Sequence, residues 1–201
     1  MTKKPARTRL LPDDRRAQLI CHAVACFADH GIARATQAQV AARADVSVSA
    51  VYSYFRTRAD LVAAVLEFVE TTIAAMVIDA LAAPLPALEA LTNLAGRTAD
   101  MALHEPDTVR VWLDWSTGVR ANVWPQFLTL QSRLRVLVEE VLVRAGGNGS
   151  APEEQLVKSA ARLFVGGAHT LALMRFENVS ETELNLFIDQ MVAGVLSALG
   201  R

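Results

Sequence analysis

The stretch that decides the fold runs from Thr36 to Phe55 and reads TQAQVAARADVSVSAVYSYF. Thr36 and Ser47 are good helix N-cap residues, so the stretch predicts two short helices joined by a tight turn. Alanines within residues 41–44 would let the two helices cross closely. The second helix, residues 48–55, is mostly small or polar where it should be exposed, as entry into the major groove of DNA requires. The pattern therefore predicts a helix-turn-helix.

The flanking residues extend this motif into a helical head. Pro12 is well placed to open a first helix and Gly31 to end it, with apolar residues at helical spacing between them. Residues 1–11 are polar, basic and without hydrophobic pattern, so we expect them to form a flexible arm. A long amphipathic helix should follow the break at residues 56–58. We therefore expect a DNA-binding domain over residues 12–57.

The remainder of the chain, residues 58–201, continues the helical pattern. Only 7 prolines and 10 glycines interrupt 201 residues, and strand-forming residues are sparse beside Ala and Leu. Further helices are expected at about 87–104, 107–120, 122–145, 153–175 and 181–199. The predicted fold class is all-α, with about nine helices: an N-terminal three-helix DNA-binding domain and a C-terminal effector-binding and dimerisation domain.

The charge distribution supports a nucleic-acid partner for the head. The formal net charge of the whole chain is −1, but its first 60 residues carry ten basic and five acidic side chains. The head is thus +5 and the remainder −6. A basic head on an acidic body is typical of a DNA-binding module joined to a second module of different function.

Other function classes find little support in the sequence. The four histidines have no partners at metal-ligand spacing, and residues 146–150 lack the Lys-Ser/Thr that follows a phosphate-binding loop. We therefore expect no metal and no cofactor. A small helical enzyme is a remote alternative because no nucleophile–base or carboxylate pair is apparent, and the basic head disfavours an adaptor that binds only protein. The apolar stretch 71–88 is interrupted by Asp79 and two prolines, so we expect a cytoplasmic protein without a membrane span.

The run VSVSAVYSYFRTRADLV, residues 46–62, resembles the signature of the TetR family of regulators. Two further stretches are similar to the LuxR/HapR-like branch of that family: Arg7-Thr8-Arg9-Leu10 and VWLDWSTGVRANVWPQFL at 111–128. The branch usually shows Ala, Thr and Asn where this chain has Ser49, Ala50 and Ser53. The surface that would read the bases therefore differs from that of the branch, so we do not expect this chain to recognise the operator sequence of the branch.

Several side chains of the head and arm are expected to contact DNA. Arg7 and Arg9 would insert into an A·T-rich minor groove, or else form a solvated tail. Either Tyr52 or Tyr54 should be a core residue and the other a phosphate contact; the resemblance implies that Tyr54 contacts phosphate. Arg58, like Arg56, could contact phosphate or only be solvated. The full set of expected DNA contacts is Arg7, Arg9, Thr36, Gln37, Ser47, Ser49, Ala50, Ser53, Tyr54 and Arg58.

The body is expected to hold a small, mainly apolar effector. Trp112 and Trp115 lie three residues apart, hence on one helix face, where they either pack in the core or line a cavity between the body helices. Gln131 and Arg135, one turn apart, could supply polar groups, and an arginine would favour an acidic head group. The resemblance implies pocket positions at Ile73, Trp112, Gln131, Arg135 and Ala168. With neighbours at helical spacing, the expected effector contacts are Ile73, Met76, Trp112, Trp115, Gln131, Arg135 and Ala168.

The last two expected helices are apolar on more than one face, which predicts a homodimer through residues 153–199. Gly166 and Gly167 within a helical run suggest a close helix crossing there. Dimer symmetry requires a pseudo-palindromic operator in double-stranded DNA. The sequence thus predicts a dimeric, ligand-modulated transcriptional regulator, most commonly a repressor in the family. The alternative is a global, quorum-sensing-type regulator that both activates and represses without an obligatory ligand.

Overall fold

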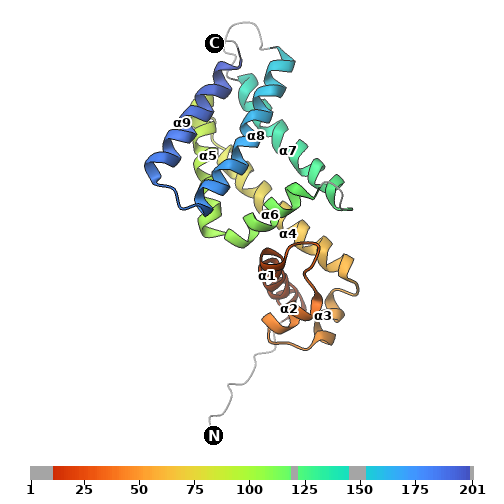
Figure 1. Ribbon diagram of the computed structural model, residues 1–201. Helices are drawn as coiled ribbons and strands as arrows, with labels where there is room; N and C mark the ends of the chain where they lie inside the picture. The colour runs from red at the N-terminus through yellow and green to blue at the C-terminus, as the bar shows by residue number, and fades with distance from the viewer. Residues whose placement is uncertain (1–10, 119–121, 145–152, 200–201) are drawn as a thin grey trace. The chain divides into compact units, whose positions relative to one another are not determined.

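The computed structural model describes residues 11–118, 122–144 and 153–199, and Arg7 and Arg9 lie outside these ranges. Helices and no strands are found in the described ranges (Figure 1). They are α1 (Pro12–His30), α2 (Gln37–Arg43), α3 (Val48–Tyr54), α4 (Arg58–Ala80), α5 (Ala87–His104), α6 (Pro106–Thr117), α7 (Trp124–Arg144), α8 (Glu154–Phe176) and α9 (Glu181–Ser197). The predicted all-α class is confirmed.

The chain divides into two compact units, one ending at Phe68 and the other beginning at Val69. We call them the head and the body. The boundary falls inside α4, whereas the sequence placed it between residues 57 and 58. The physical reason is that the first half of α4 supplies buried side chains to the head, among them Leu61 and Val65, both fully buried.

Local capping determines where the helices of the head begin and end. The Thr36 hydroxyl accepts from the Gln39 backbone N–H at 3.3 Å, and the Gln39 side chain accepts from the Thr36 N–H at 2.8 Å, which together form a capping box. Thr57 and Asp60 make the same reciprocal pair at the start of α4. Gly31 ends α1 with φ of 80°, a backbone conformation that favours glycine.

The tight turn between α2 and α3 is built around Asp45, which has φ of 51°. Asp tolerates this left-handed conformation better than most side chains do. Ser47 then caps α3 as predicted, its hydroxyl accepting from the Ala50 N–H at 3.2 Å. The turn and the cap together fix where α3 begins.

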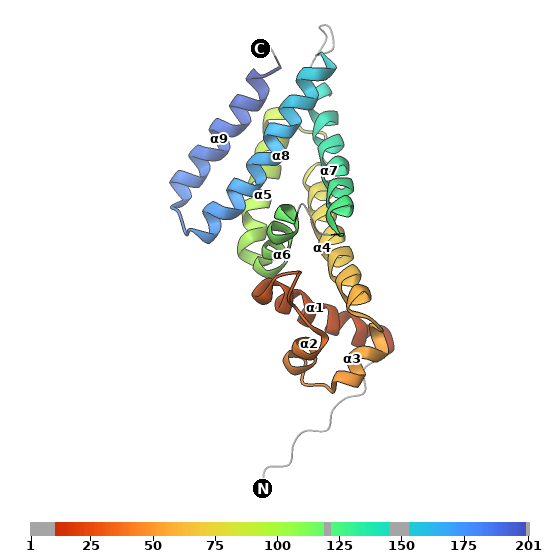
Figure 2. The same ribbon diagram turned by 45° about the vertical axis from the view of Figure 1, so that its right-hand side comes forward.

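The body is built around α8, which contacts α5, α7 and α9. Figure 2 shows α8 running between α9 on one side and α7 on the other. The α8–α9 contact depends on Gly167, because a Cβ there would collide with the Met191 side chain, whereas a Cβ at Gly166 would meet nothing within 4 Å. A close crossing is thus present at Gly167 within the chain, and Gly166 lies on an open face.

In the part of the chain that the structure describes, one helix, α4, is long and apolar enough to cross a membrane by length and composition, with a mean hydropathy of 2.0. The expectation that the chain has no membrane span was based on residues 71–88 and did not consider the whole of this helix. Half of its apolar window is buried inside the protein. Its Glu70 also pairs with Arg133 of α7 at 2.5 Å. Burial in the cores of two units accounts for an apolar helix of this length.

Candidate functional sites

The side chains that α3 exposes are mixed in size and polarity. Ser49, Tyr52 and Ser53 are exposed, while Val51 and Phe55 are buried as the pattern predicts. Val48, at the start of α3, is 42% exposed. The major groove admits an α-helix, and the small hydroxyl side chains of Ser49 and Ser53 on the exposed surface of α3 are compatible with such entry.

All three predicted serines on or beside α3 already make hydrogen bonds within this segment. Ser53 Oγ donates to the Ala50 carbonyl at 2.7 Å, and Ser47 Oγ is the helix cap. Ser49 Oγ lies 3.0 Å from Ser47 Oγ. Ala50 itself is half-buried. The hydroxyls of Ser47 and Ser53 therefore have part of their hydrogen-bonding capacity committed before DNA arrives.

Gln37 and Arg58, both expected to contact DNA, also have hydrogen-bond partners within the head. Gln37 is only 5% exposed and its Nε2 donates to the Phe55 carbonyl at 2.6 Å, which ties α2 to the end of α3. Arg58 Nε donates to the Ala35 carbonyl at 3.0 Å, and Nη2 donates to the Ile32 carbonyl. Helical spacing cannot reveal such pairings, because the partners are carbonyls 18 to 26 residues away.

The remaining predicted DNA contacts of the head are more accessible. Tyr52 is 47% exposed and Tyr54 is half-buried, so neither tyrosine is fully buried in the core. Thr36 is exposed, although its hydroxyl serves as the cap of α2. Arg56 is exposed at the break after α3. Hydroxyl and guanidinium groups at such positions can contact backbone phosphate.

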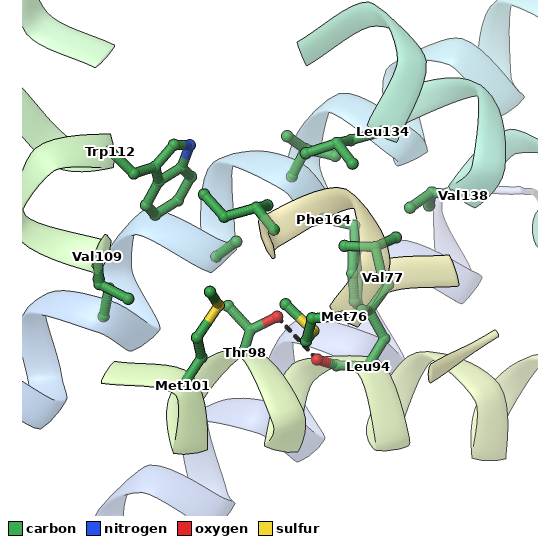
Figure 3. A pocket seen from close by; sticks show the side chains of 14 residues that line it. Met76, Val77, Leu94, Thr98, Met101, Val109, Trp112, Leu134, Val138 and Phe164 are labelled. Carbon is green, nitrogen blue, oxygen red and sulfur yellow. Dashed lines mark hydrogen bonds between the residues drawn. The ribbon is translucent and has the colours of Figure 1, made fainter. Parts of the chain in front are cut away.

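A cavity lies in the body among α4, α5, α6, α7 and α8 (Figure 3). The cavity has a volume of about 50 Å³, which is more than a single water molecule needs but less than the usual volume of a small-molecule site. Its lining is almost wholly apolar: Ile73, Met76, Val77, Leu94, Thr98, Met101, Val109, Trp112, Leu134, Val138, Phe164, Val165, Ala168 and Ala172. The structure thus brings together four residues of the predicted effector set, namely Ile73, Met76, Trp112 and Ala168.

The contribution of α5 to this cavity was missed. Leu94, Thr98 and Met101 come from α5, at a spacing of four and then three residues that defines one helix face. That periodicity was visible in the sequence, but a face of ordinary core residues gives no sign that it borders a cavity. The Thr98 hydroxyl donates to the Leu94 carbonyl at 2.8 Å, the bond drawn in Figure 3.

The two neighbouring tryptophans of α6 have different surroundings. Trp112 is 6% exposed and lines the cavity, with its ring 4.1 Å from the ring of His169 between centroids. Trp115 is fully buried outside the cavity lining, donates from its indole nitrogen to the Val123 carbonyl at 2.9 Å, and packs edge-on against Phe127. Trp115 is therefore a core residue, because three residues along a helix turn the side chain by about 60°.

Gln131 and Arg135 also lie outside the cavity. They line a separate groove between α7 and α8, together with Arg162 and His169. Arg135 is engaged with Glu139, its Nε lying 3.2 Å from the carboxylate. Burial lowers the pKa of the His169 imidazole, and a hydrogen bond to the Val165 carbonyl offsets this only in part. The predicted polar groups are near the cavity but do not line it.

Comparison with known proteins agrees with this architecture. Residues 19–65 match the family described as "Bacterial regulatory proteins, tetR family". The chain is 32% identical over 184 residues to the HTH-type transcriptional regulator LuxR of Vibrio harveyi, covering 92% of this chain and 89% of that protein.

Solved structures show the same fold at lower identity. A TetR-like transcriptional regulator from Rhodococcus sp. RHA1 has a TM-score of 0.74 and 19% identity, covering 96% of this chain and 97% of that one. The fatty acid degradation regulator FadR from Bacillus halodurans has a TM-score of 0.71 and 16% identity, covering 90% and 97%. The chain therefore belongs to the TetR family, and it is a DNA-binding transcriptional regulator whose helix-turn-helix is formed by α2 and α3.

Proposed function

We propose that this chain is a cytoplasmic homodimeric repressor whose affinity for a pseudo-palindromic operator is modulated by a small, mainly apolar molecule bound in the body. The observation that carries the proposal is the almost wholly apolar cavity beside Trp112, which is lined by five helices of the body. A packed protein interior has few voids larger than a water molecule, and a hydrocarbon-lined cavity that exceeds this size is the default place for a ligand.

A ligand controls DNA binding only if it binds the free and the DNA-bound conformations with different affinities. The direct test begins with an operator selected from a random duplex library. Binding of that duplex is then measured by fluorescence anisotropy, with and without each member of a library of small apolar compounds. We expect at least one compound that raises the melting temperature of the body to weaken operator binding. Compounds that stabilise the protein without changing operator affinity would contradict the proposal.

The dimer is proposed to form through α8 and α9. Exposed leucines lie on the outer face of α8, at 57% for Leu163 and 49% for Leu173, and Leu186 of α9 is 56% exposed. Gly166 and Gly194 leave open space where a Cβ would stand, so a partner helix can approach closely. Self-association is the common way to cover such a face in this kind of protein.

Leu163→Glu tests this interface, because burying an unpaired carboxylate between the two protomers costs too much free energy. We expect sedimentation to show a monomer at micromolar concentration and operator affinity to fall by roughly 100-fold, since two half-sites can no longer be held together. Leu103→Glu is the matched control, as Leu103 is 51% exposed on α5, outside the proposed interface. Equal behaviour of the two variants would contradict the interface.

Within the dimer, α3 is proposed to enter the major groove, with base or phosphate contacts from Ser49, Ala50, Ser53 and Tyr54. Arg7 and Arg9 of the arm are proposed to reach the adjacent minor groove. The basic head, net +5 over its first 60 residues, supplies the salt-dependent attraction to phosphate.

A second candidate is a global regulator that activates and represses without an obligatory ligand. The 32% identity to LuxR of Vibrio harveyi over most of both chains favours it. The two candidates differ in how they respond to a filled cavity. Ala168→Phe would occupy the space beside Trp112. It should abolish ligand response in the first case, and it should leave gene regulation unchanged in the second.

A further inference from the structure

The cavity wall contains a buried hydrogen-bond donor without a partner. Among the described residues, the buried side-chain nitrogen and oxygen atoms that lack one are Trp112 Nε1 and Arg175 Nε. Trp112 is 94% buried and lines the cavity directly. A buried donor left unsatisfied is rare in native proteins and is costly enough to require an explanation.

The neighbours of the indole do not supply an acceptor. His169 lies across the face of the ring, at an interplanar angle of 31°, rather than at its N–H edge. The Thr98 hydroxyl donates to the Leu94 carbonyl, and its oxygen makes no hydrogen bond with the indole nitrogen. Figure 3 draws the indole nitrogen on the side of the ring toward Leu134, a hydrocarbon side chain. Within the described lining, the indole N–H is therefore the unpaired donor that remains for a ligand, beside the Thr98 oxygen, which can still accept.

The charge around the cavity argues against an anionic ligand. No lysine or arginine is among the described residues that line it. Arg135 lines the separate groove and is paired with Glu139 at 3.2 Å. His169 is held toward its neutral form by burial, which lowers its pKa. An isolated carboxylate in such a cavity would lose its hydration without gaining a counter-charge.

We propose that the effector is an uncharged, mainly apolar molecule with one strong hydrogen-bond acceptor, a ketone or ester carbonyl, which accepts from Trp112 Nε1. The inference rests on the proposed function, because it names the chemistry of the same site. The acceptor relieves the unsatisfied indole N–H, and the hydrocarbon part of the ligand contacts Leu94, Val109 and Phe164. Selectivity then comes from a single bond in an apolar site, which rejects analogues that leave the donor unpaired.

Three probes of nearly the same shape test the proposal. Acetophenone has a carbonyl oxygen, α-methylstyrene has a CH2 group in its place, and benzoate has a charge. Each is titrated into the nitrogen-15-labelled full chain while the indole N–H resonances are followed by NMR. We expect acetophenone to move the Trp112 indole proton downfield in a saturable way. We expect α-methylstyrene to bind without that shift and benzoate to bind most weakly.

Trp112→Phe removes the donor and keeps an aromatic ring. We expect it to weaken acetophenone binding by roughly threefold to tenfold more than α-methylstyrene binding, the range of one neutral hydrogen bond. Trp124→Phe is the control, because Trp124 stacks on Phe127 and is not among the residues lining the cavity. It should leave the dissociation constants of both probes unchanged.

The outcomes separate this inference from the proposed function. The inference is overturned if three results occur together: acetophenone and α-methylstyrene both bind in the cavity, the Trp112 resonance does not respond to the carbonyl, and Trp112→Phe affects both probes equally. The cavity would then still be a ligand site. Tighter binding of benzoate than of acetophenone overturns the uncharged ligand class. If no probe binds, both the inference and the effector part of the proposed function are overturned. The comparison of probes on the unmodified chain is decisive even if Trp112→Phe fails to fold.

Discussion

The head and the body differ in whether the described residues include a buried polar atom without a hydrogen-bond partner. In the head, Gln37 is buried but its amide is satisfied by the Phe55 carbonyl at 2.6 Å. In the described part of the body, Trp112 Nε1 and Arg175 Nε are buried without a partner. Buried polar groups that are fully hydrogen-bonded hold a recognition surface rigid. A buried donor without a partner beside a cavity instead favours binding of a ligand that supplies an acceptor.

This difference fits what each unit must do. The helix-turn-helix reads DNA with side chains held in fixed positions, so its capping boxes and interhelical bonds should be formed without a ligand. The body must respond to a ligand, so part of its stabilisation is expected to come from the ligand itself. The following predictions test this contrast, beginning with the largest expected effect.

Trp115→Ala should destabilise the body strongly, because Trp115 is fully buried and its indole bonds to the Val123 carbonyl. Truncating a buried tryptophan typically costs about 3–5 kcal/mol. The measurement is urea unfolding followed by circular dichroism. Trp112→Ala should cost less, because its ring borders an existing cavity. Equal losses for the two variants would mean that Trp112 is ordinary core.

Gln37→Ala tests the satisfied interior of the head. It removes the donor to the Phe55 carbonyl, and that carbonyl is left buried without this bond. We expect the free energy of unfolding to fall by about 1–3 kcal/mol. Gln18→Ala is the matched control, since Gln18 is exposed on α1. If Gln37→Ala instead weakens DNA binding with no loss of stability, Gln37 acts at the interface as the sequence first indicated.

The same contrast explains what the sequence could and could not predict. Short-range features were predictable: Ser47 and Thr36 as caps, Gly31 as the end of α1, and helix bounds such as 87–104, which match α5. The role of Gln37 was not, because its partner lies 18 residues away and is a backbone carbonyl, which has no sequence signature.

The candidate effector site was predictable only in outline. Trp112 and Ile73 line the cavity, whereas Gln131 and Arg135, which the resemblance also implied, line the separate groove. Trp115, which shares a helix face with Trp112, is not among the residues that line the cavity. Spacing defines which residues share a face, but the width of that face exceeds the width of the cavity. Which residues border open space depends on how five helices pack together, and that is a tertiary property.

Arg58 and Arg56 offer a smaller test within the head. Arg58 bonds the Ala35 and Ile32 carbonyls, whereas Arg56 is exposed. Arg58→Ala should lower the stability of the head by roughly 1 kcal/mol, the typical net value of an intramolecular hydrogen bond. Arg56→Ala should leave stability unchanged. It should reduce the slope of the logarithm of DNA affinity against the logarithm of salt concentration by about one, the value of one phosphate contact. The opposite pattern would assign the phosphate contact to Arg58.

The smallest predicted effect concerns the pH dependence of the body. Burial lowers the pKa of His169 below its ordinary value of 6.5, so the unfolded chain binds the proton more readily than the folded chain. Stability should therefore be unaffected by this group above pH 6.5 and should fall as the pH decreases below it. The loss ends once the pH is below the folded pKa.

His169→Gln isolates this contribution. Arg135 and Arg162 are the charged residues that line the same groove among the described residues, and they are present in both proteins. Thermal unfolding of the two proteins between about pH 7.5 and pH 5 should show the unmodified chain losing stability faster, by at most about 1.4 kcal/mol per pH unit for a single group. His22, His30 and His104 are common to both proteins and cancel in the difference. If stability depends on pH in the same way in both proteins, the His169 imidazole is exposed to water. It would then not be buried against the Trp112 ring.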